Sequence, residues 1–239
     1  MKAFLLAAGK GTRLLPLTLT TPKCLVPVSN KPLIEYWFDL FSLYGINDVL
    51  INTSHLAEKV RKYISNSSKG LNIKLTYEES LLGSGGTVKK NWDFVKGESS
   101  FFICYADNLT NINMQRMLEF HNKHKKDFTL ALLRVPNPKE CGIVELDENS
   151  SVISFNEKPE NPVSDLAFAG IMLSNRNLKN YFPEHDCFDL GFDVLPRVTG
   201  YASGYIMNEY LLDIGTYKKL EQAEEDIKNG ALSAGKRAF

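Results

Sequence analysis

Short apolar runs alternate with amphipathic stretches in the first half of the chain, and glycine, proline or asparagine stands at the joints. Residues 3–7 are apolar at every position, which is typical of a parallel strand covered on both faces. Asn30 is expected to cap the first helix and Gly45 to end it. Strands that alternate with helices indicate an α/β fold. Beyond 3–7, the pattern predicts strands at 48–52, 73–77 and 101–105, and helices at 32–44, 54–64 and 87–95.

The pattern changes after Asn111. It predicts a helix to about His124, then several strands, and a last helix from Tyr217 to about Lys228. We therefore expect a Rossmann-like, mostly parallel central sheet with helices on both faces, followed by a mixed, partly antiparallel part. The strands of that second part are predicted at 129–135, 142–146, 152–155 and 167–173.

The sequence contains no internal repeat and no linker, so a single domain over 1–239 is the economical interpretation. Its two halves are expected to be 1–110 and 111–239. The last ten residues, rich in alanine, glycine and lysine, are expected to fray.

Charge and cysteine content narrow the function classes. Lys+Arg and Asp+Glu both number 28, so no global basic field favours nucleic acid, and an anion site must be local. The apolar start of the chain stops at Gly9, far short of the roughly 20 residues of a membrane helix. The four cysteines are widely separated and have no zinc-site spacing. We expect a cytoplasmic protein with free thiols.

The candidate chemistry begins where the first strand ends, in the glycine-rich segment 9–13 (GKGTR). In open α/β sheets, ligands bind beyond the carboxyl ends of strands, and a glycine-rich turn there exposes N–H groups to phosphate oxygens. A dinucleotide fingerprint would need glycine at Leu14, and the Walker A spacing is absent. Arg13 and Lys23 add two fixed cations to the same loop, as a triphosphate requires.

Residues 5–33 resemble the signature of the sugar-1-phosphate nucleotidyltransferases, also called NDP-sugar pyrophosphorylases: L-A-x-G-x-G-[TS]-R-L-x-P-L-T, then P-K-x-[LM]-[VL]-P-[VI] and K-P. The resemblance continues at spaced motifs to about residue 224. It implies an enzyme that joins an NTP to a sugar 1-phosphate and releases pyrophosphate, with 1–110 as the nucleotide-binding half.

Residues 78–86 resemble the family segment E-x-x-x-L-G-T-A-G, which lies against the nucleotide base; Ser84 and Gly85 replace threonine and alanine. As a bare sequence, this stretch fits a hairpin turn equally well. The nucleotide-binding residues that the resemblance implies are Leu6, Ala8, Gly9, Gly11, Thr12, Arg13, Lys23, Glu79, Gly83, Ser84, Gly85 and Asp107.

Asp107 follows the apolar strand 101–105, at a position where a carboxylate can bind Mg²⁺ or cap a helix. Asp213 lies in a segment similar to the family's W-x-D-I-G-T, with Leu211 in place of tryptophan. The resemblance implies that Asp107 and Asp213 together hold a catalytic Mg²⁺.

Glu157 and Lys158 resemble the family's E-K-P motif, in which the glutamate bonds sugar hydroxyls and the lysine holds the sugar's phosphate. By the same resemblance, Gly142 and Gly170 let the backbone approach the sugar. The alternative is a surface ion pair between the two charged residues. The catalytic residues implied are Arg13, Lys23 and Lys158.

The attacking oxygen of a sugar phosphate is already ionised, so no strong general base is required, and positioning and charge neutralisation can carry the catalysis. The four histidines fall in no motif, and we interpret them as structural or surface residues. The motifs are most similar to mannose- and manno-heptose-1-phosphate guanylyltransferases of bacterial surface-glycan pathways, which favours GTP. UTP-, CTP- and dTTP-dependent relatives and phosphocholine cytidylyltransferases share motifs. The expected partners are an NTP and a sugar 1-phosphate, with no nucleic acid or membrane; a homodimer is left open.

Two other classes were weighed. A non-catalytic regulatory module on the same fold should have lost Arg13, Lys23, Asp107 or Asp213, and all four are present. A glycosyltransferase should show a D-x-D metal motif, and none fits.

Overall fold

The structure is a computed structural model, and it describes residues 1–232. The chain forms two compact units that are interleaved along the sequence. Unit 1 comprises 1–81, 105–113 and 209–239, and unit 2 comprises 82–104 and 114–208. A division at residue 110 therefore does not follow the units, and the single domain stays a prediction.

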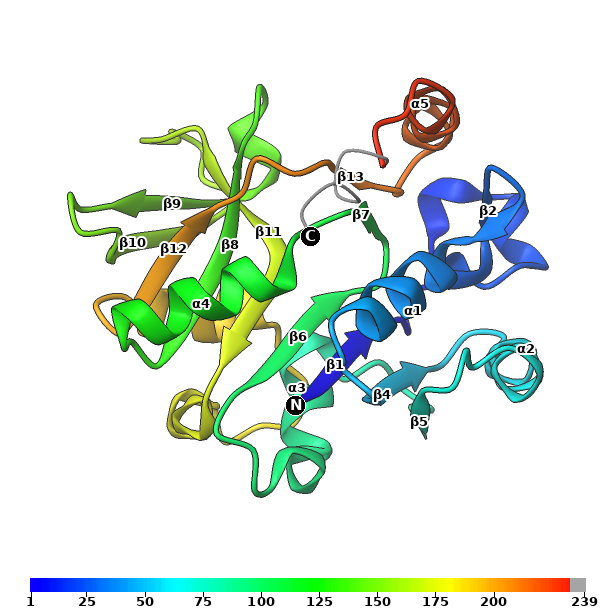
Figure 1. The fold of residues 1–239 in the computed structure, drawn as a ribbon, viewed down its shortest axis with the longest axis horizontal. Helices are drawn as coiled ribbons and strands as arrows, with labels where there is room; N and C mark the ends of the chain where they lie inside the picture. The colour runs from blue at the N-terminus through cyan, green and yellow to red at the C-terminus, as the bar shows by residue number, and fades with distance from the viewer. Residues whose placement is uncertain (233–239) are drawn as a thin grey trace. The chain divides into compact units, whose positions relative to one another are not determined.

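Unit 1 contains the expected parallel strands. β1 (Lys2–Leu6) pairs with β4 (Asp48–Thr53), and β4 pairs with β5 (Asn72–Tyr77), all parallel (Figure 1). Phe4 and Leu50, which are partners in this register, are fully buried. A short antiparallel pair joins β7 (Asn108–Thr110) to β13 (Leu211–Asp213).

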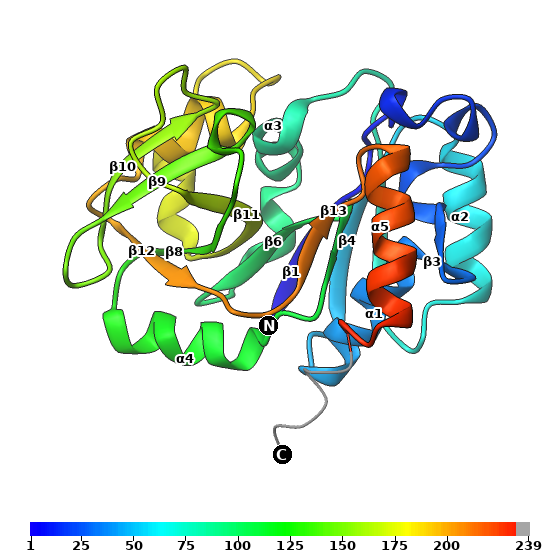
Figure 2. The same cartoon turned by 90° about the horizontal axis from the view of Figure 1, so that it is seen from above.

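The helices of unit 1 are α1 (Leu33–Leu43), α2 (Ala57–Asn66) and α5 (Tyr217–Lys228). Figure 2 shows α5 alongside β13, which it contacts. The expectation that Asn30 caps α1 is wrong. The residue lies at φ 63° in the turn between β2 (Pro27–Val28) and β3 (Lys31–Pro32), because these two short strands form a hairpin before the helix.

Unit 2 holds the mixed sheet. β11 (Leu166–Ser174) pairs antiparallel with β6 (Phe101–Tyr105), β8 (Phe128–Arg134) and β9 (Gly142–Leu146). β10 (Val152–Glu157) pairs antiparallel with β9. β12 (Ala202–Ile206), which the pattern analysis missed, is parallel to β8. The α/β class with a mixed second part is thereby confirmed.

Unit 2 contains the α-helices α3 and α4. α4 (Met114–His124) lies across β8 and β12 in Figure 1 and contacts both. α3 (Gly83–Lys90) begins at the glycine-rich segment and stops earlier than the predicted helix 87–95, whose last residues form a separate short turn. The hairpin turn considered for this segment is therefore wrong.

All four cysteines are free thiols, and burial raises the pKa of Cys24 to about 12. Among the described residues, no helix has the length and apolar character needed to cross a membrane. Most of the segment expected to fray lies outside the described residues.

Candidate functional site

The loop after β1 is packed on itself. Gly11 has φ 64°, a left-handed conformation that favours glycine. A Cβ built there would lie 2.9 Å from Thr18 Cγ2 and 3.2 Å from Lys23 Cβ, so only a glycine lets Lys23 come this close to the glycine-rich turn. The Thr18 hydroxyl donates to the Gly11 carbonyl at 2.9 Å. Apart from Gly9 itself and its two chain neighbours, no atom of the described chain lies within 4 Å of a Cβ built on Gly9, which leaves room for a ligand there.

Distant elements hold this loop in place. The Tyr217 hydroxyl, from α5, donates to the Leu14 carbonyl at 3.1 Å and accepts from the Leu17 N–H at 3.3 Å. His55 Nε2 lies 2.8 Å from the Thr18 carbonyl. Because a carbonyl only accepts, this nitrogen carries the proton. The loop that bears Arg13 and the glycines is thus fixed from two other parts of unit 1.

Lys23 lies beside both predicted metal ligands. Its ammonium is 2.6 Å from Asp107 Oδ2 and 3.7 Å from Asp213 Oδ1. The two carboxylates meet because β7 pairs with β13, with Asn108 opposite Asp213, and because the Ile214 N–H donates to the Asp107 carbonyl at 2.8 Å. Asp107 follows a strand and precedes another, so the helix-cap alternative is wrong.

The Asp213 carboxylate is only partly satisfied. Lys219, from α5, donates to Oδ2 at 2.8 Å, whereas Oδ1 is buried and has no hydrogen-bond partner in the described chain. A Cβ built on Gly215 would lie 2.7 Å from an Arg13 guanidinium nitrogen and 2.9 Å from Asp213 Oδ2. Gly215 therefore lets the arginine and the carboxylate come together. A buried carboxylate oxygen without a hydrogen-bond partner, next to a second carboxylate, suits a hard cation that would take the place of the Lys23 ammonium.

A buried polar chain supports the end of β1. The Ala7 N–H donates to Asn52 Oδ1 at 2.7 Å, and Asn52 Nδ2 donates to Glu78 Oε1 at 3.0 Å. Glu78 is 1% exposed, whereas Glu79, the predicted nucleotide ligand, is exposed. The sequence predicted no separate role for Asn52 or Glu78. Asn52 lies near the polar end of β4, and Glu78 is the first residue of the segment 78–86 that resembles the family motif.

In unit 2, the glycines at the start of α3 pack against the segment that contains Phe188. A Cβ on Gly83 would lie 2.3 Å from the Phe188 carbonyl oxygen, and one on Gly85 would lie 2.3 Å from the Phe188 ring. The Gly85 and Gly86 N–H groups both donate to that carbonyl at 3.1 Å. Close packing against Phe188 therefore requires glycine at these positions whether or not a nucleotide binds there. Contact of these glycines with a nucleotide stays a prediction.

Ser84 and Asp189 connect the same two segments. The Ser84 hydroxyl donates to Asp189 Oδ2 at 2.7 Å and accepts from the Leu190 N–H at 2.8 Å. The other carboxylate oxygen of Asp189 accepts from the Gly191 N–H at 2.8 Å. The start of α3 and the turn at 189–191 are thus held as one piece.

Glu157 lies in a narrow corner of unit 2. Cβ atoms built on Gly142 and on Gly191 would each lie 2.6 Å from its Oε2. Burial raises the pKa of Glu157, the negative charge of Asp189 adds to this rise, and Lys158 opposes it. Glu157 is therefore a carboxylate with raised proton affinity, close to backbone that only glycine can provide.

Lys158 has a conformation that is uncommon for a residue with a side chain. Its φ is 49°, and its N–H donates to the Cys141 carbonyl at 2.9 Å. The ammonium lies 5.8 Å from the centre of the Phe192 ring, which is 58% exposed. Within the described chain Glu157 and Lys158 form no ion pair, so the surface-pair alternative is wrong.

Gly170 lies in β11 at the point where the strand's register shifts, and its φ is 69°. Its observed role is therefore in the conformation of the backbone.

The structure therefore brings the predicted residues into two groups, one in each unit. The unit 1 group joins the glycine-rich loop to Arg13, Lys23, Asp107 and Asp213. The unit 2 group joins Gly142, Glu157 and Lys158. Leu6, Ala8 and Thr12 lie on β1 or the loop after it. Residues to which the sequence assigned no role in the site are Asn52, Glu78, Asp189, Gly191, Phe192, Tyr217 and Lys219.

Comparisons with known proteins all point to nucleotidyltransferases. Residues 2–230 match the family model described as Nucleotidyl transferase. The chain is 30% identical over 95% of its length to a mannose-1-phosphate guanylyltransferase of Mycobacterium tuberculosis. It is 30% identical over 83% of its length to a UTP–glucose-1-phosphate uridylyltransferase of Synechocystis sp.. It spans 65% and 55% of these two relatives' own lengths.

A third relative has nearly the same length. The D-glycero-α-D-manno-heptose 1-phosphate guanylyltransferase of Aneurinibacillus thermoaerophilus is 28% identical, over 96% of this chain and 99% of its own. Among solved structures, a proposed glucose-1-phosphate thymidylyltransferase from Bacillus anthracis is similar with a TM-score of 0.83. That similarity is at 25% identity and covers 94% of each chain.

Proposed function

The chain belongs to the nucleotidyl transferase family, and from that premise we propose that it condenses an NTP with a sugar 1-phosphate to give an NDP-sugar and pyrophosphate. The observation that carries the proposal is the unit 1 group, where one lysine lies between two carboxylates beside a glycine-rich loop. This arrangement matches the needs of a triphosphate: N–H donors, fixed cations and a cation site.

Nucleotidyltransferases of this family generally use a divalent metal. We propose Mg²⁺ for this chain, held by Asp107 and Asp213. Asp213 Oδ1, which is buried and has no hydrogen-bond partner in the described chain, fits this role. Within residues 1–232 no cluster of three or more ligating side chains exists, so phosphate oxygens and water would complete the coordination. When bound, the ion would neutralise negative charge on the reacting phosphates.

The protein's own residues have distinct tasks in this proposal. Arg13 and Lys23 bind the triphosphate of the NTP, and Lys158 binds the phosphate of the sugar. One oxygen of that phosphate forms a bond to the α-phosphorus, while the bond from the α-phosphorus to the bridging oxygen breaks and pyrophosphate leaves. No strong general base is needed because the attacking oxygen is already ionised. Glu157 orients the sugar through its hydroxyls.

For the substrates we propose GTP with mannose 1-phosphate or a heptose 1-phosphate. The support is similarity along nearly the whole chain to two guanylyltransferases named for these sugars. The names of other relatives specify UTP or dTTP, so these nucleotides are the alternatives, together with CTP and phosphocholine. A cytoplasmic location and a place in surface-polysaccharide synthesis belong to the same proposal.

The test is pyrophosphate release with Mg²⁺ across four NTPs and a panel of sugar 1-phosphates that also includes phosphocholine. Release with GTP and mannose or heptose 1-phosphate, absent in Asp107→Ala and Asp213→Ala, supports the proposal. Release with another pair would keep the reaction and correct the substrates. Silence throughout, with normal NTP binding, would favour the non-catalytic module.

A further inference from the structure

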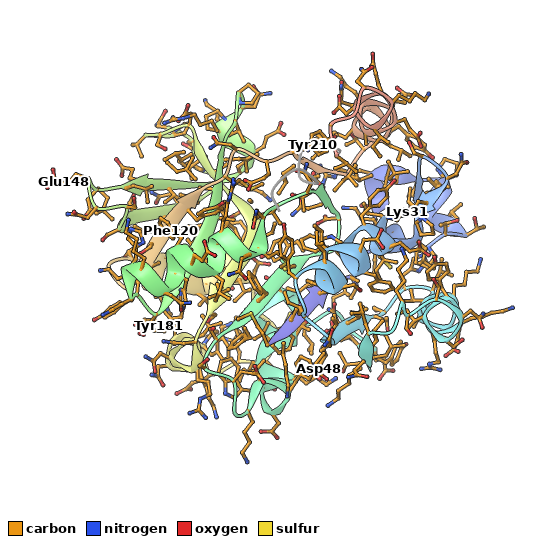
Figure 3. All side chains as sticks on the ribbon, in the orientation of Figure 1. Lys31, Asp48, Phe120, Glu148, Tyr181 and Tyr210 are labelled. Atoms are coloured by element: carbon orange, nitrogen blue, oxygen red, sulfur yellow. The ribbon has the colours of Figure 1, made fainter. Side chains whose placement is uncertain are left out.

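A hollow of about 470 Å³ opens on unit 2 beside the C-terminal end of α4. Three segments form its wall: the end of α4 with the turn that follows, the turn between β9 and β10, and β12. In Figure 3, Phe120 marks α4 and Glu148 marks the tip of the β9–β10 hairpin. None of the residues that we assign to the nucleotide or the sugar phosphate lines this hollow.

The lining is polar and carries an excess of positive charge. Lys123, His124 and Lys126 line it from one segment, against a single carboxylate, that of Glu148. Across the described part of the chain, neither lysine forms an ion pair with a carboxylate. Lys126 donates to the Gly200 carbonyl at 2.6 Å, which holds it near β12. The uncompensated ammonium groups favour an anionic ligand.

Ser203 provides an independent observation. The residue is among those that line the hollow, it is 1% exposed, and its hydroxyl is buried with no hydrogen-bond partner in the described chain. Buried hydroxyl groups are almost always hydrogen-bonded, and each exception calls for a missing partner. Rotation of the Ser203 side chain towards the hollow would let its hydroxyl donate this hydrogen bond to a ligand oxygen.

The wall is already formed. Ser151 forms a backbone bridge with Ser203, and the Gly204 N–H donates to the Ser150 carbonyl at 2.9 Å. Asp147 Oδ1 accepts from the Ser151 N–H at 2.7 Å, which fixes the turn between β9 and β10. The donors therefore need little ordering when a ligand binds.

We propose that this hollow binds the phosphate group of a small phosphorylated molecule. A phosphate has several oxygens that can accept from ammonium and hydroxyl groups at once. A volume of about 470 Å³ lies within the range of small-molecule sites and leaves room for an organic part. The balanced charge of the chain, 28 basic against 28 acidic residues, argues against a polyanion such as nucleic acid.

Calorimetric titration with inorganic phosphate, at an ionic strength fixed with NaCl, tests the proposal. The double variant Lys23→Gln/Lys158→Gln serves as the parent, because it removes a phosphate-binding cation from each of the two groups that we assign to the substrates. We expect Lys123→Gln and Lys126→Gln to weaken binding about tenfold, and Ser203→Ala to weaken it about threefold or more. Lys125→Gln is the matched control, because this exposed lysine lies in the same turn outside the hollow and its loss changes the net charge equally.

Thermal unfolding separates binding from folding. Without phosphate, Ser203→Ala should melt at the parent's temperature or above, because the hydroxyl that is lost has no partner. Phosphate should raise the melting temperature of the parent and of Lys125→Gln, and raise that of Ser203→Ala less. The proposal is overturned if the parent does not bind phosphate, if the three lining variants bind like the parent, or if Lys125→Gln weakens binding equally.

Discussion

The Ser84 hydroxyl donates a 2.7 Å hydrogen bond to the carboxylate of Asp189. This bond joins the first turn of α3 to the turn that bears Gly191, and Gly191 in turn borders Glu157. Within unit 2, a segment that we assign to the nucleotide is therefore connected to the group that we assign to the sugar phosphate.

This connection predicts a measurable coupling. Ser84→Ala and Asp189→Asn should each destabilise the fold, and a double-mutant cycle in urea should give a coupling energy of about 1–2 kcal/mol. Ser65→Ala, which removes a hydroxyl bond on the exposed face of α2, is the control and should show no coupling to Asp189→Asn. Additive effects of the first pair would show that the bond does not hold the two segments together.

Gly191 should act on the sugar phosphate through Glu157. In Gly191→Ala, the new Cβ would lie 2.6 Å from Glu157 Oε2, so the carboxylate must move. We expect the KM for the sugar 1-phosphate to rise about tenfold to a hundredfold, with the KM for the NTP nearly unchanged. Steady-state kinetics with each substrate varied in turn provides both values. An equal rise in the two constants would point to a general loss of structure.

The Tyr217 hydroxyl should matter for the nucleotide. Tyr217→Phe removes both bonds that α5 makes to the loop at Leu14 and Leu17, and the KM for the NTP should rise about fivefold or more. Tyr210→Phe is the matched control, because it removes a bond to Asp226 in the same unit without contact to the loop. Similar KM values in the two variants would contradict a role for α5 in positioning the loop.

Glu157 should make stability depend on pH. Its folded-state pKa lies above the ordinary 4.5, chiefly because of burial, so the folded protein takes up a proton more readily than the unfolded chain. As pH rises from 4.5 to the folded pKa, the unfolding free energy of the wild type should fall relative to Glu157→Gln, and then stay level. Glu160→Gln, at an exposed position nearby in the chain, is the control variant. A relative rise with pH would contradict the burial argument.

Lys23 should compete with metal in the free protein. Because its ammonium lies 2.6 Å from Asp107 and 3.7 Å from Asp213, Lys23→Met should bind Mn²⁺ about threefold or more tightly in an electron-paramagnetic-resonance titration. The same variant should lose activity, because the triphosphate loses a counter-charge. Lys59→Met, an exposed lysine whose ammonium donates to Thr20 of the same loop, is the control. Weaker Mn²⁺ binding in Lys23→Met would remove the basis for a shared cation site.

Local patterns predicted much of the fold. The strand 142–146 and the last helix, from Tyr217 to Lys228, match in their bounds, because apolar periodicity and terminal residues define such elements. The start of α3 did not follow from local sequence. Gly83 to Gly86 is a poor helix start by propensity, and only the distant Phe188 segment explains it.

In the candidate site, too, some residues follow from local motifs and others only from long-range packing. Motif spacing indicated Asp107 and Asp213, whose proximity the pairing of β7 with β13 explains. The corner that holds Glu157 depends on Gly191, which carries no motif and comes close only through long-range packing. Lys219 likewise reaches Asp213 because α5 begins at Tyr217, shortly after Asp213, and places Lys219 in its first turn.

The most direct test of the central claim is single-turnover formation of an NDP-sugar, followed by mass spectrometry, with wild type and Asp213→Asn in the presence and absence of Mg²⁺. Wild type with Mg²⁺ should convert GTP and mannose or heptose 1-phosphate to the GDP-sugar. Asp213→Asn should be at least about a hundredfold slower, while its melting temperature stays close to that of the wild type. Equal rates in the two proteins, or a GDP-sugar formed at the same rate without a divalent metal, would contradict it.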